Sequence, residues 1–435
     1  MKKFNTSPIS GMQELLPAKQ ALFDKLKNEI AGVYHSHGFL SIETPVIERT
    51  EILLAKAGGD TEKQIYKVVK TAETEGDADQ ALRFDHTVPL ARYVVEHEND
   101  LTFPFKVTQI GRNFRGERAQ KGRFREFYQL DVDVIGREQL DVFYDAEVVK
   151  TAYDALKTFI KPEMKIRISN RKILSGLLQE LGLQTKSEDI FGIIDHAEKV
   201  PKEKTIAAFE EIGLSNAEIE KLTTFMDIRG EREAVNASLN NLGISNEIFE
   251  AGVSELSQVL EILEESGMKG VAIGDMLIIR GLDYYTGSVF ETFLPEYKEI
   301  GSICSGGRYE NLAGNYTEKK MPGVGISIGL TRLFYVLNEY NLLDNADEQP
   351  VDLVLIPFSS DQLIYTYNLA DKLRGAGKKV DVNLTFDRKL GDRIKYASKV
   401  SNFMSVIGEN EVETGNTEVK NLVSGEKAKL EDYIR

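Results

Sequence analysis

"RNFRGERAQKGRFREFYQLDVDVIG", residues 112–136, joins a basic run to a strict alternation of polar and apolar residues. Alternation with a period of two predicts a β-strand, because successive side chains of a strand point to opposite faces. The apolar face carries Tyr128, Leu130, Val132 and Val134. The other face carries Phe127, Gln129, Asp131 and Asp133. Carboxylates in a row repel one another unless they bind cations or hydrogen-bond donors. This face therefore indicates a site for a cation, and the alternative is a solvated outer face.

The first half of this stretch predicts a basic hairpin loop. The upstream stretch "FPFKVTQIGRNF" is also strand-like, so the two strands would flank "RGERAQKGR". Two acidic residues, Glu117 and Glu126, face six basic ones, which are Arg112, Arg115, Arg118, Lys121, Arg123 and Arg125. One guanidinium group can donate two parallel hydrogen bonds to two oxygens of a phosphate. The loop therefore suits a nucleotide, and the alternative is a solvated turn.

A second alternating stretch is "PGVGISIGLTRLF", residues 322–334. Its apolar face would carry Val324, Ile326, Ile328 and Leu330, and its other face Gly323, Gly325, Ser327 and Gly329. Glycine weakens a strand and is common where a ligand or another backbone approaches closely. We expect a continuous strand on which a planar ring could lie, with Arg332 beyond it to stack or pair. The alternative is close packing within the protein.

Two catalytic motifs match this stretch only superficially. The glycines from Gly323 to Gly329 nearly fit the dinucleotide-binding fingerprint, but with one residue too many. Gly325-Ile-Ser327-Ile-Gly329 fits the nucleophile elbow of serine hydrolases, which requires a sharp turn and a histidine later in the chain. The last histidine is His196. We reject both interpretations.

Three further stretches carry polar side chains suited to a site. In "LRFDHTVPLARY", residues 82–93, Thr87 can cap a helix that begins near Pro89. Asp85 would then lie at a strand end able to hold an ammonium group, whereas pure capping is the alternative. "IIRGLDYYTGSVFE", residues 278–291, offers an arginine to stabilise developing phosphate charge, beside two tyrosines. "CSGGRYENL", residues 304–312, adds a turn that allows close backbone approach.

The rest of the chain indicates several domains of a protein without membrane segments. Its 435 residues exceed one ordinary domain. The net charge of −15 argues against a nonspecific nucleic-acid coat but permits local basic patches. No apolar stretch is long enough to span a bilayer, and the start lacks the apolar core of a signal peptide. With the single cysteine Cys304 and no zinc-type cluster, we expect a reduced, cytoplasmic setting.

Helical periodicity predicts a long amphipathic helix at 18–37 and a second helix near 141–160. Short helical patterns rich in Leu, Ile and Glu fill about 172–268, which indicates a helical insertion. Strand character returns from 271 to about 330, and 351–435 alternates apolar strands with helices.

Taken together, these motifs resemble the histidyl-tRNA synthetases, which are class II aminoacyl-tRNA synthetases, over essentially the whole chain. "FRGERAQKGRFREFYQLDVDVIG" is similar to motif 2 of that family, "GVGISIGLTRL" to motif 3, and "FLSIETPVIERTEIL" to motif 1, with Pro45 at its proline. "RGLDYYTGSVFE" and "CSGGRYENL" resemble its two histidine signatures.

The resemblance implies an α+β fold: an antiparallel sheet core with flanking helices, a helical insertion and a small C-terminal α/β anticodon-binding domain. It places the catalytic core at 1–169 and 271–338, the insertion at 170–270, a linker at 339–350 and the anticodon-binding domain at 351–435.

The resemblance also implies roles for individual residues. Histidine would be bound by Asp85, Thr87, Arg115, Gln129, Asp133, Arg280, Tyr284 and Tyr285. ATP would be bound by Arg115, Glu117, Arg123, Phe127 and Arg332. Arg280 and Arg115 would be the catalytic residues, and Arg118 with Gln120 would contact tRNA. No dedicated metal site of the protein is implied.

The implied reaction joins histidine to the 3′ end of tRNA-His through a histidyl-adenylate, using ATP and Mg²⁺, in a homodimer. The alternative is a histidine-sensing regulatory subunit of ATP phosphoribosyltransferase, a paralogue that typically lacks the C-terminal domain. The chain departs from the family pattern at several positions. Asp85 and Asp133 stand where many bacterial members have glutamate, Thr331 where a glutamate is usual, and Ser305, Glu310 and Asn311 vary the second histidine signature.

Overall fold

The computed structural model describes residues 4–55, 62–72, 79–119, 122–279, 284–343 and 349–434. The chain forms two compact units that divide at Leu343, except that Glu14–Leu26 belongs to the second unit. Each unit is described separately below.

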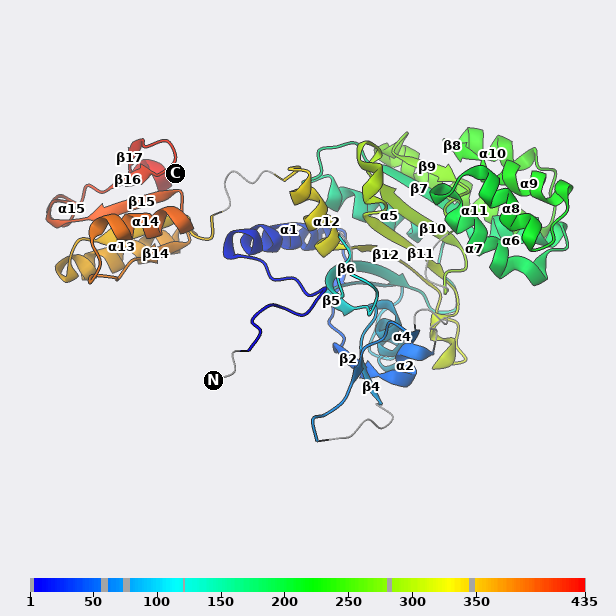
Figure 1. The fold of residues 1–435 in the computed structure, drawn as a ribbon, viewed down its shortest axis with the longest axis horizontal. Coiled ribbons are helices and arrows are strands. Elements are labelled where there is room, and N and C mark those ends of the chain that lie inside the picture. The colour runs from blue at the N-terminus through cyan, green and yellow to red at the C-terminus, as the bar shows by residue number, and fades with distance from the viewer. Residues whose placement is uncertain are drawn as a thin grey trace. The chain divides into compact units, whose positions relative to one another are not determined.

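A nine-stranded sheet forms the centre of the first unit (Figure 1). Its strands, in spatial order, are β1 (Leu40–Ser41), β5 (Phe105–Phe114), β6 (Glu126–Ile135), β12 (Gly323–Ile328), β11 (Cys304–Tyr309), β10 (Ser288–Phe293), β7 (Lys165–Asn170), β9 (Ala272–Asp275) and β8 (Arg229–Gly230). Strands β5 to β7 in this order pair antiparallel, whereas β1 with β5 and β7 with β9 pair parallel. This mixed sheet with flanking helices confirms the predicted α+β fold.

The predicted hairpin is β5 and β6, paired from Phe105↔Ile135 to Phe114↔Glu126. The apolar face of β6 is fully buried at Leu130, Val132 and Val134, as the alternation predicts. The polar face is buried as well, since Asp131 is 4% and Asp133 3% exposed. A solvated outer face is therefore excluded for these two carboxylates.

The predicted continuous strand at 322–334 is wrong in its second half. Strand β12 ends at Ile328, Gly329 caps the next element, and helix α12 (Leu330–Glu339) begins immediately. Leu330 is buried as the first residue of the helix. It fits both the strand alternation before it and the helical spacing after it. Ser327 lies inside β12 and not at the turn, which agrees with rejecting a nucleophile elbow.

Helices cover the apolar face of this sheet. The predicted long helix is confirmed as α1 (Pro17–Ser36), and the Tyr34 hydroxyl donates to the Leu130 carbonyl of β6 at 3.2 Å. The second predicted helix is α5 (Phe143–Leu156), which packs on β12, β6 and β11. Helix α12 packs on β6. The buried pair Arg308–Asp145, at 2.8 Å, ties β11 to α5. The opposite face of the sheet is left to the polar side chains.

A helical segment follows β7 and lies beyond the β7–β9–β8 end of the sheet (Figure 1). It comprises α6 (Arg171–Glu180), α7 (Ser187–His196), α8 (Lys202–Glu211), α9 (Asn216–Met226), α10 (Arg232–Asn240) and α11 (Glu247–Leu263). These helices confirm the helical character predicted for about 172–268, although β8 is inserted among them. Between β9 and β10, residues 276–279 and 284–287 are not strand, although strand was predicted there.

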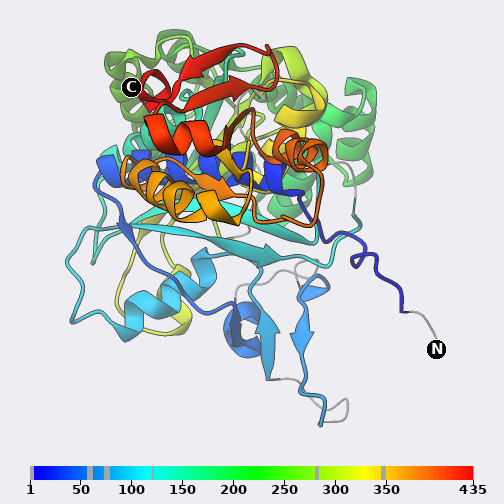
Figure 2. The same cartoon turned by 90° about the vertical axis from the view of Figure 1, so that its left-hand side faces the viewer.

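A small sheet of β2 (Ile47–Arg49), β4 (Gln80–Leu82) and β3 (Lys67–Val68) carries the chain toward the polar face, together with α2 (Thr50–Leu54) and α4 (Thr87–Glu96). Figure 2 shows these elements in blue. Strand β4 leads directly into Asp85, His86 and α4, and it therefore delivers these residues to the sheet.

The C-terminal part is an α/β unit, as predicted. Its five-stranded sheet has the order β14 (Val380–Val382), β13 (Leu353–Pro357), β15 (Phe403–Ile407), β16 (Glu418–Asn421) and β17 (Lys427–Lys429). Its helices are α13 (Leu363–Gly375), α14 (Leu390–Val400), α15 (Glu409–Thr414) and α16 (Leu430–Ile434). No described helix of the whole chain has the length and apolar character needed to cross a membrane.

Candidate active site

The polar face of the large sheet carries an ordered row of side chains. Register places Asp131 of β6 opposite Gln109 on one side and Ser327 on the other, and Ser327 opposite Ser305. One step along, Asp133 lies opposite Gly325, which lies opposite Gly307. Paired residues share a face, so strands distant in sequence build one surface here.

The glycines in this surface make room for protein groups. A Cβ on Gly325 would lie 2.1 Å from the Asp133 carboxylate, and one on Gly323 would lie 2.3 Å from the Tyr309 ring. The Tyr309 hydroxyl in turn donates to Asp133 at 2.9 Å. The expected ring-binding floor is therefore filled by Tyr309 and Asp133 at these two glycines. Gly329, by contrast, has nothing within 4 Å of its Cβ position.

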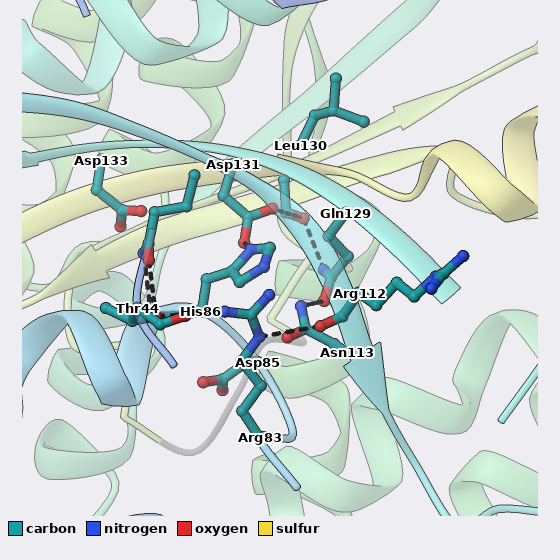
Figure 3. A network of polar contacts seen from close by, with 12 residues as sticks. Thr44, Arg83, Asp85, His86, Arg112, Asn113, Gln129, Leu130, Asp131 and Asp133 are labelled. Atoms are coloured by element: carbon teal, nitrogen blue, oxygen red, sulfur yellow. Dashed lines mark hydrogen bonds and ion pairs between the residues drawn. The ribbon is translucent and has the colours of Figure 1, made fainter. Parts of the chain in front are cut away.

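Three carboxylates converge on this surface from two segments (Figure 3). Asp131 and Asp133 come from β6, and Asp85 comes from the end of the β4 segment. Burial, followed by repulsion from Asp131, raises the pKa of Asp133 to about 8, and Asp85 adds to the rise. Among the described residues the Tyr309 hydroxyl opposes it. Burial also raises the pKa of Asp85, against the Val88 amide and Arg115. The surface is short of positive charge.

Asp85, rather than Thr87, caps helix α4. The Val88 amide donates to an Asp85 oxygen at 3.0 Å, whereas His86 and Thr87 make no such capping bond. The predicted Thr87 cap is therefore wrong, although the helix begins at Thr87 and Pro89 lies in its first turn. Because one oxygen suffices for the cap, Asp85 can serve both the helix and a ligand.

His86 has a local hydrogen-bonding role. Its ring is fully buried, and Nδ1 lies 2.7 Å from Asp131 Oδ2. Since a carboxylate accepts, Nδ1 carries the hydrogen. Asp131 is thereby held against the sheet.

The raised pKa of Asp133 gives a stability prediction. A carboxyl with a folded pKa above its unfolded value contributes stability below about pH 4, and that contribution is lost as pH rises through about 8. We expect Asp133→Asn to remove this loss. Without ligand, its melting temperature relative to wild type should rise by about 2 °C or more between pH 6 and pH 9, measured by calorimetry.

Asp371→Asn is the matched control, because Asp371 is 71% exposed and its partner Arg374 keeps its charge over this range, so the replacement should leave the difference independent of pH. If the melting temperature of Asp133→Asn relative to wild type stays constant or falls as pH rises, the charge of the Asp133 carboxylate is already balanced within the folded protein.

Arg115 lies at the edge of the carboxylate cluster. Its guanidinium is 4.3 Å from the Phe84 ring centroid and 5.1 Å from that of Phe127, and Nε donates to the Phe84 carbonyl at 3.3 Å. Its charge opposes the rise that burial causes in the pKa of Asp85. Two aromatic rings thus orient a guanidinium fork at the base of the basic loop, next to the carboxylates.

Arg332, Arg123 and Glu117 form a second group where the loop meets α12. Burial and the nearby Arg123 charge lower the pKa of Arg332, whereas Glu291 and Glu117 act in the opposite direction. Arg123 and Glu117 lie 3.6 Å apart. Arg332 donates to the Ile300 carbonyl and also lies beside Gly122. Two arginines with two acidic residues suit a nucleotide carrying phosphates.

Thr331 has a structural task. Its hydroxyl accepts the Tyr128 amide at 2.8 Å, which joins the start of α12 to β6. The residue thus fixes the spacing between the motif 2 and motif 3 segments.

Three tyrosines surround Asp133. Tyr284 lies edge-to-face with Tyr285 at 5.1 Å and with Tyr309 at 6.0 Å. Burial and the Asp133 charge raise the pKa of Tyr285 and of Tyr309, so both hydroxyls keep their hydrogens. The candidates taken from the sequence include Tyr284 and Tyr285 but not Tyr309. Tyr309 lies in the quoted stretch 304–312, but its contact with Asp133 depends on strand order.

Among the remaining candidates, Arg118 is exposed on the basic loop. Arg280 and Gln120 lie outside the described residues. Arg112, one of the six basic residues of the predicted hairpin, does not face the site, because it pairs with Glu126 at 2.9 Å on the other face of β5. Within the part of the chain that the structure describes, no group of three or more His, Cys, Asp or Glu side chains could hold a metal ion.

Comparison with known families agrees with this geometry. The family described as histidyl-tRNA synthetase matches residues 11–333, and the anticodon binding domain family matches residues 352–432. The chain is 43% identical over 443 residues to a histidine–tRNA ligase of Clostridium tetani, covering 100% of this chain and 99% of the relative.

Solved structures with the same fold include a histidyl-tRNA synthetase from a Nostoc species. It is 37% identical, with a TM-score of 0.88 and coverage of 99% of this chain and 98% of the other. A Bacillus halodurans protein described as an ATP phosphoribosyltransferase regulatory subunit/histidyl-tRNA synthetase is 23% identical, with a TM-score of 0.77 over 94% of this chain and 99% of that one. At that identity the second likeness concerns the fold alone.

Proposed function

Because the chain belongs to the histidyl-tRNA synthetase family and acts as a histidine–tRNA ligase, we propose that its buried carboxylate cluster binds histidine. Asp133 with Tyr285 would bind the imidazole, since one carboxylate and one hydroxyl can read two different ring nitrogens. Asp85, Thr87 and Gln129 would hold the α-ammonium group, and Tyr284 would line the pocket.

One observation carries this assignment. Asp85, Asp131 and Asp133 are all buried, and burial together with the charges of Asp131 and Asp85 raises the pKa of Asp133 to about 8. A cationic ligand relieves the repulsion that raises this pKa. Histidine supplies one permanent ammonium group and ring N–H donors, and its own carboxylate would remain for Arg115.

ATP would bind along the basic loop, with Arg115 on the α-phosphate, Arg123 and Glu117 beside it, and Phe127 and Arg332 near the adenine. In the first step a histidine carboxylate oxygen attacks the α-phosphorus, a new O–P bond forms and pyrophosphate leaves. In the second step the tRNA 3′ end attacks the activated carbonyl and AMP leaves. The protein contributes position and charge rather than a covalent nucleophile.

Mg²⁺ would reach the site together with the ATP phosphates. Glu117 and Glu291, both near Arg332, are the described carboxylates that fit one or two direct contacts. Bound there, the ion would neutralise phosphate charge. The residues of the chain would orient the phosphates around it.

The remaining assignments follow the family. We propose Arg280 as a second stabiliser of the α-phosphate charge, and Arg118 with Gln120 as contacts of the tRNA acceptor end. The domain division at 169/170, 270/271, 338/339 and 350/351, a homodimer and a cytoplasmic location complete the proposal. The match at 352–432 supports anticodon binding by the C-terminal unit.

The test is ATP–pyrophosphate exchange driven by each amino acid in turn, followed by charging of tRNA-His. We expect exchange with histidine alone, and charging that depends on ATP and Mg²⁺. The pairing of Asp133 with Tyr285 predicts this selectivity, because an imidazole offers an N–H donor and a nitrogen acceptor at two fixed ring positions.

Histidine binding without exchange would support the regulatory-subunit alternative instead. Exchange with several amino acids would show that Asp133 does not select the side chain. Exchange without charging would place the defect in tRNA binding rather than in the pocket.

A further inference from the structure

A chain of hydrogen bonds runs behind the carboxylate cluster along the polar face of the sheet (Figure 3). His86 Nδ1 contacts Asp131 Oδ2 at 2.7 Å, and the Ser327 hydroxyl donates to Asp131 Oδ1. Gln129 Nε2 donates to Ser327 Oγ at 2.6 Å. Asn113 Nδ2 donates to Gln129 Oε1 at 2.7 Å. This series of hydrogen bonds starts at the buried Asp131 carboxylate and ends at the buried Asn113 amide, with the partly exposed Gln129 amide between Ser327 and Asn113.

The direction of every bond in this chain follows from Asp131. A carboxylate only accepts, so the single hydroxyl hydrogen of Ser327 must be directed at it. The Ser327 oxygen is then able only to accept from Gln129. The amide of Gln129 must therefore turn its Nε2 toward Ser327, and its Oε1 keeps one lone pair beyond the bond from Asn113.

We propose that Asp131 is a positioning residue that, through Ser327, presents Gln129 Oε1 as the acceptor for the α-ammonium group of histidine. This inference rests on the proposed binding of the α-ammonium group by Gln129. His86 supports the arrangement, because it occupies the second oxygen of Asp131 and holds the carboxylate in place. No other group in the described chain imposes this direction on Ser327.

The variant Asp131→Asn is expected to reverse the donor and acceptor roles along this series of hydrogen bonds. With His86 keeping its hydrogen on Nδ1, the asparagine oxygen would accept from His86, and its amide would donate to Ser327. Ser327 would then donate to Gln129, which must turn. Asn113 can turn its amide as well and accept from Gln129, because its Oδ1 has no hydrogen-bond partner among the described residues. An NH₂ group would replace Oε1 and repel the ammonium group.

We expect the KM for histidine in ATP–pyrophosphate exchange to rise by about 10–100-fold in Asp131→Asn, as for loss of a hydrogen bond to a charged group. The KM for ATP should stay within about twofold. As competitive inhibitors, histidinol has the ammonium group without a carboxylate, and imidazolepropionate the reverse. Histidinol should lose affinity by a similar factor, and imidazolepropionate by less than about threefold.

The double variant Gln129→Glu with Asp131→Asn restores an acceptor in the reversed chain and keeps the net charge. It should recover most of the histidine and histidinol affinity. Ser327→Ala interrupts the chain without reversing it, and its loss should be smaller than that of Asp131→Asn. If Asp131→Asn does not fold, as judged by circular dichroism, the double variant and Ser327→Ala carry the test.

Equal losses for histidinol and imidazolepropionate, or no recovery in the double variant, would overturn the proposal and leave Asp131 a structural role. Absence of histidine-dependent exchange in the wild-type protein would instead refute the proposed function itself.

Discussion

Replacing Arg115 with alanine should lower kcat/KM for histidine-dependent ATP–pyrophosphate exchange by about 10³-fold. The Arg115 guanidinium is held between the Phe84 and Phe127 rings, close to Asp85. We propose that it meets the α-phosphate and the attacking carboxylate together. Removing a fixed charge at the reacting centre commonly costs about 10²–10³-fold in rate, and loss of substrate binding adds to this.

Arg115→Lys should still lose about 10²-fold, because a lysine keeps the charge but lacks the planar fork and the stacking on two rings. Arg112→Ala is the matched control: it removes an arginine of the same hairpin whose side chain is 55% exposed and paired with Glu126. If Arg115→Ala retains exchange activity within about threefold of wild type, Arg115 has no role in the reaction.

The alternation at 126–135 is sufficient to predict β6 and its two faces. A strand with one buried face has a single register, because a slip by one residue would turn every apolar side chain outward. The burial of the polar face is less predictable. It depends on α4 and on the tyrosines of other segments, which cover Asp131 and Asp133.

The helix beginning at Leu330 shows the limit of local patterns. Leu330, Leu333, Phe334 and Leu337 fit a helix, whereas Val324 to Leu330 fit a strand. Leu330 belongs to both patterns, but in the structure it is buried as the first residue of the helix. Periodicity alone does not separate them at the junction. Gly329, which caps the helix, marks the boundary that the apolar pattern conceals.

Contacts between distant segments could not be predicted from any single motif. Tyr309 and Asp133 are separated by 176 residues, and His86 and Asp131 by 45. The Tyr309 contact depends on the order β6-β12-β11 in the sheet, whereas the His86 contact depends on the segment after β4 reaching β6. The Tyr309 contact also requires two glycines at specific register positions. Motifs supply the residue types, whereas the register determines which of them meet.

Asp133→Asn should raise the KM for histidine by about 10²–10³-fold, with the KM for ATP within about twofold. Truncating or neutralising one partner of a buried charged hydrogen bond costs about 2–5 kcal/mol in binding. Asn keeps the shape of the side chain, so the loss would measure the charge that Asp133 contributes to the imidazole. Steady-state exchange at saturating ATP gives this number directly.

Tyr309→Phe is the companion variant, since it keeps the carboxylate and removes the hydroxyl that donates to it at 2.9 Å. Its histidine KM should rise by only about threefold to tenfold, because histidine supplies a replacement donor. The variants of the two β6 aspartates should then differ in which inhibitors they bind more weakly. Asp133→Asn should weaken histidinol and imidazolepropionate alike, because both carry the imidazole, whereas Asp131→Asn should weaken histidinol alone. A histidine KM near the wild-type value in Asp133→Asn would assign imidazole recognition to the tyrosines.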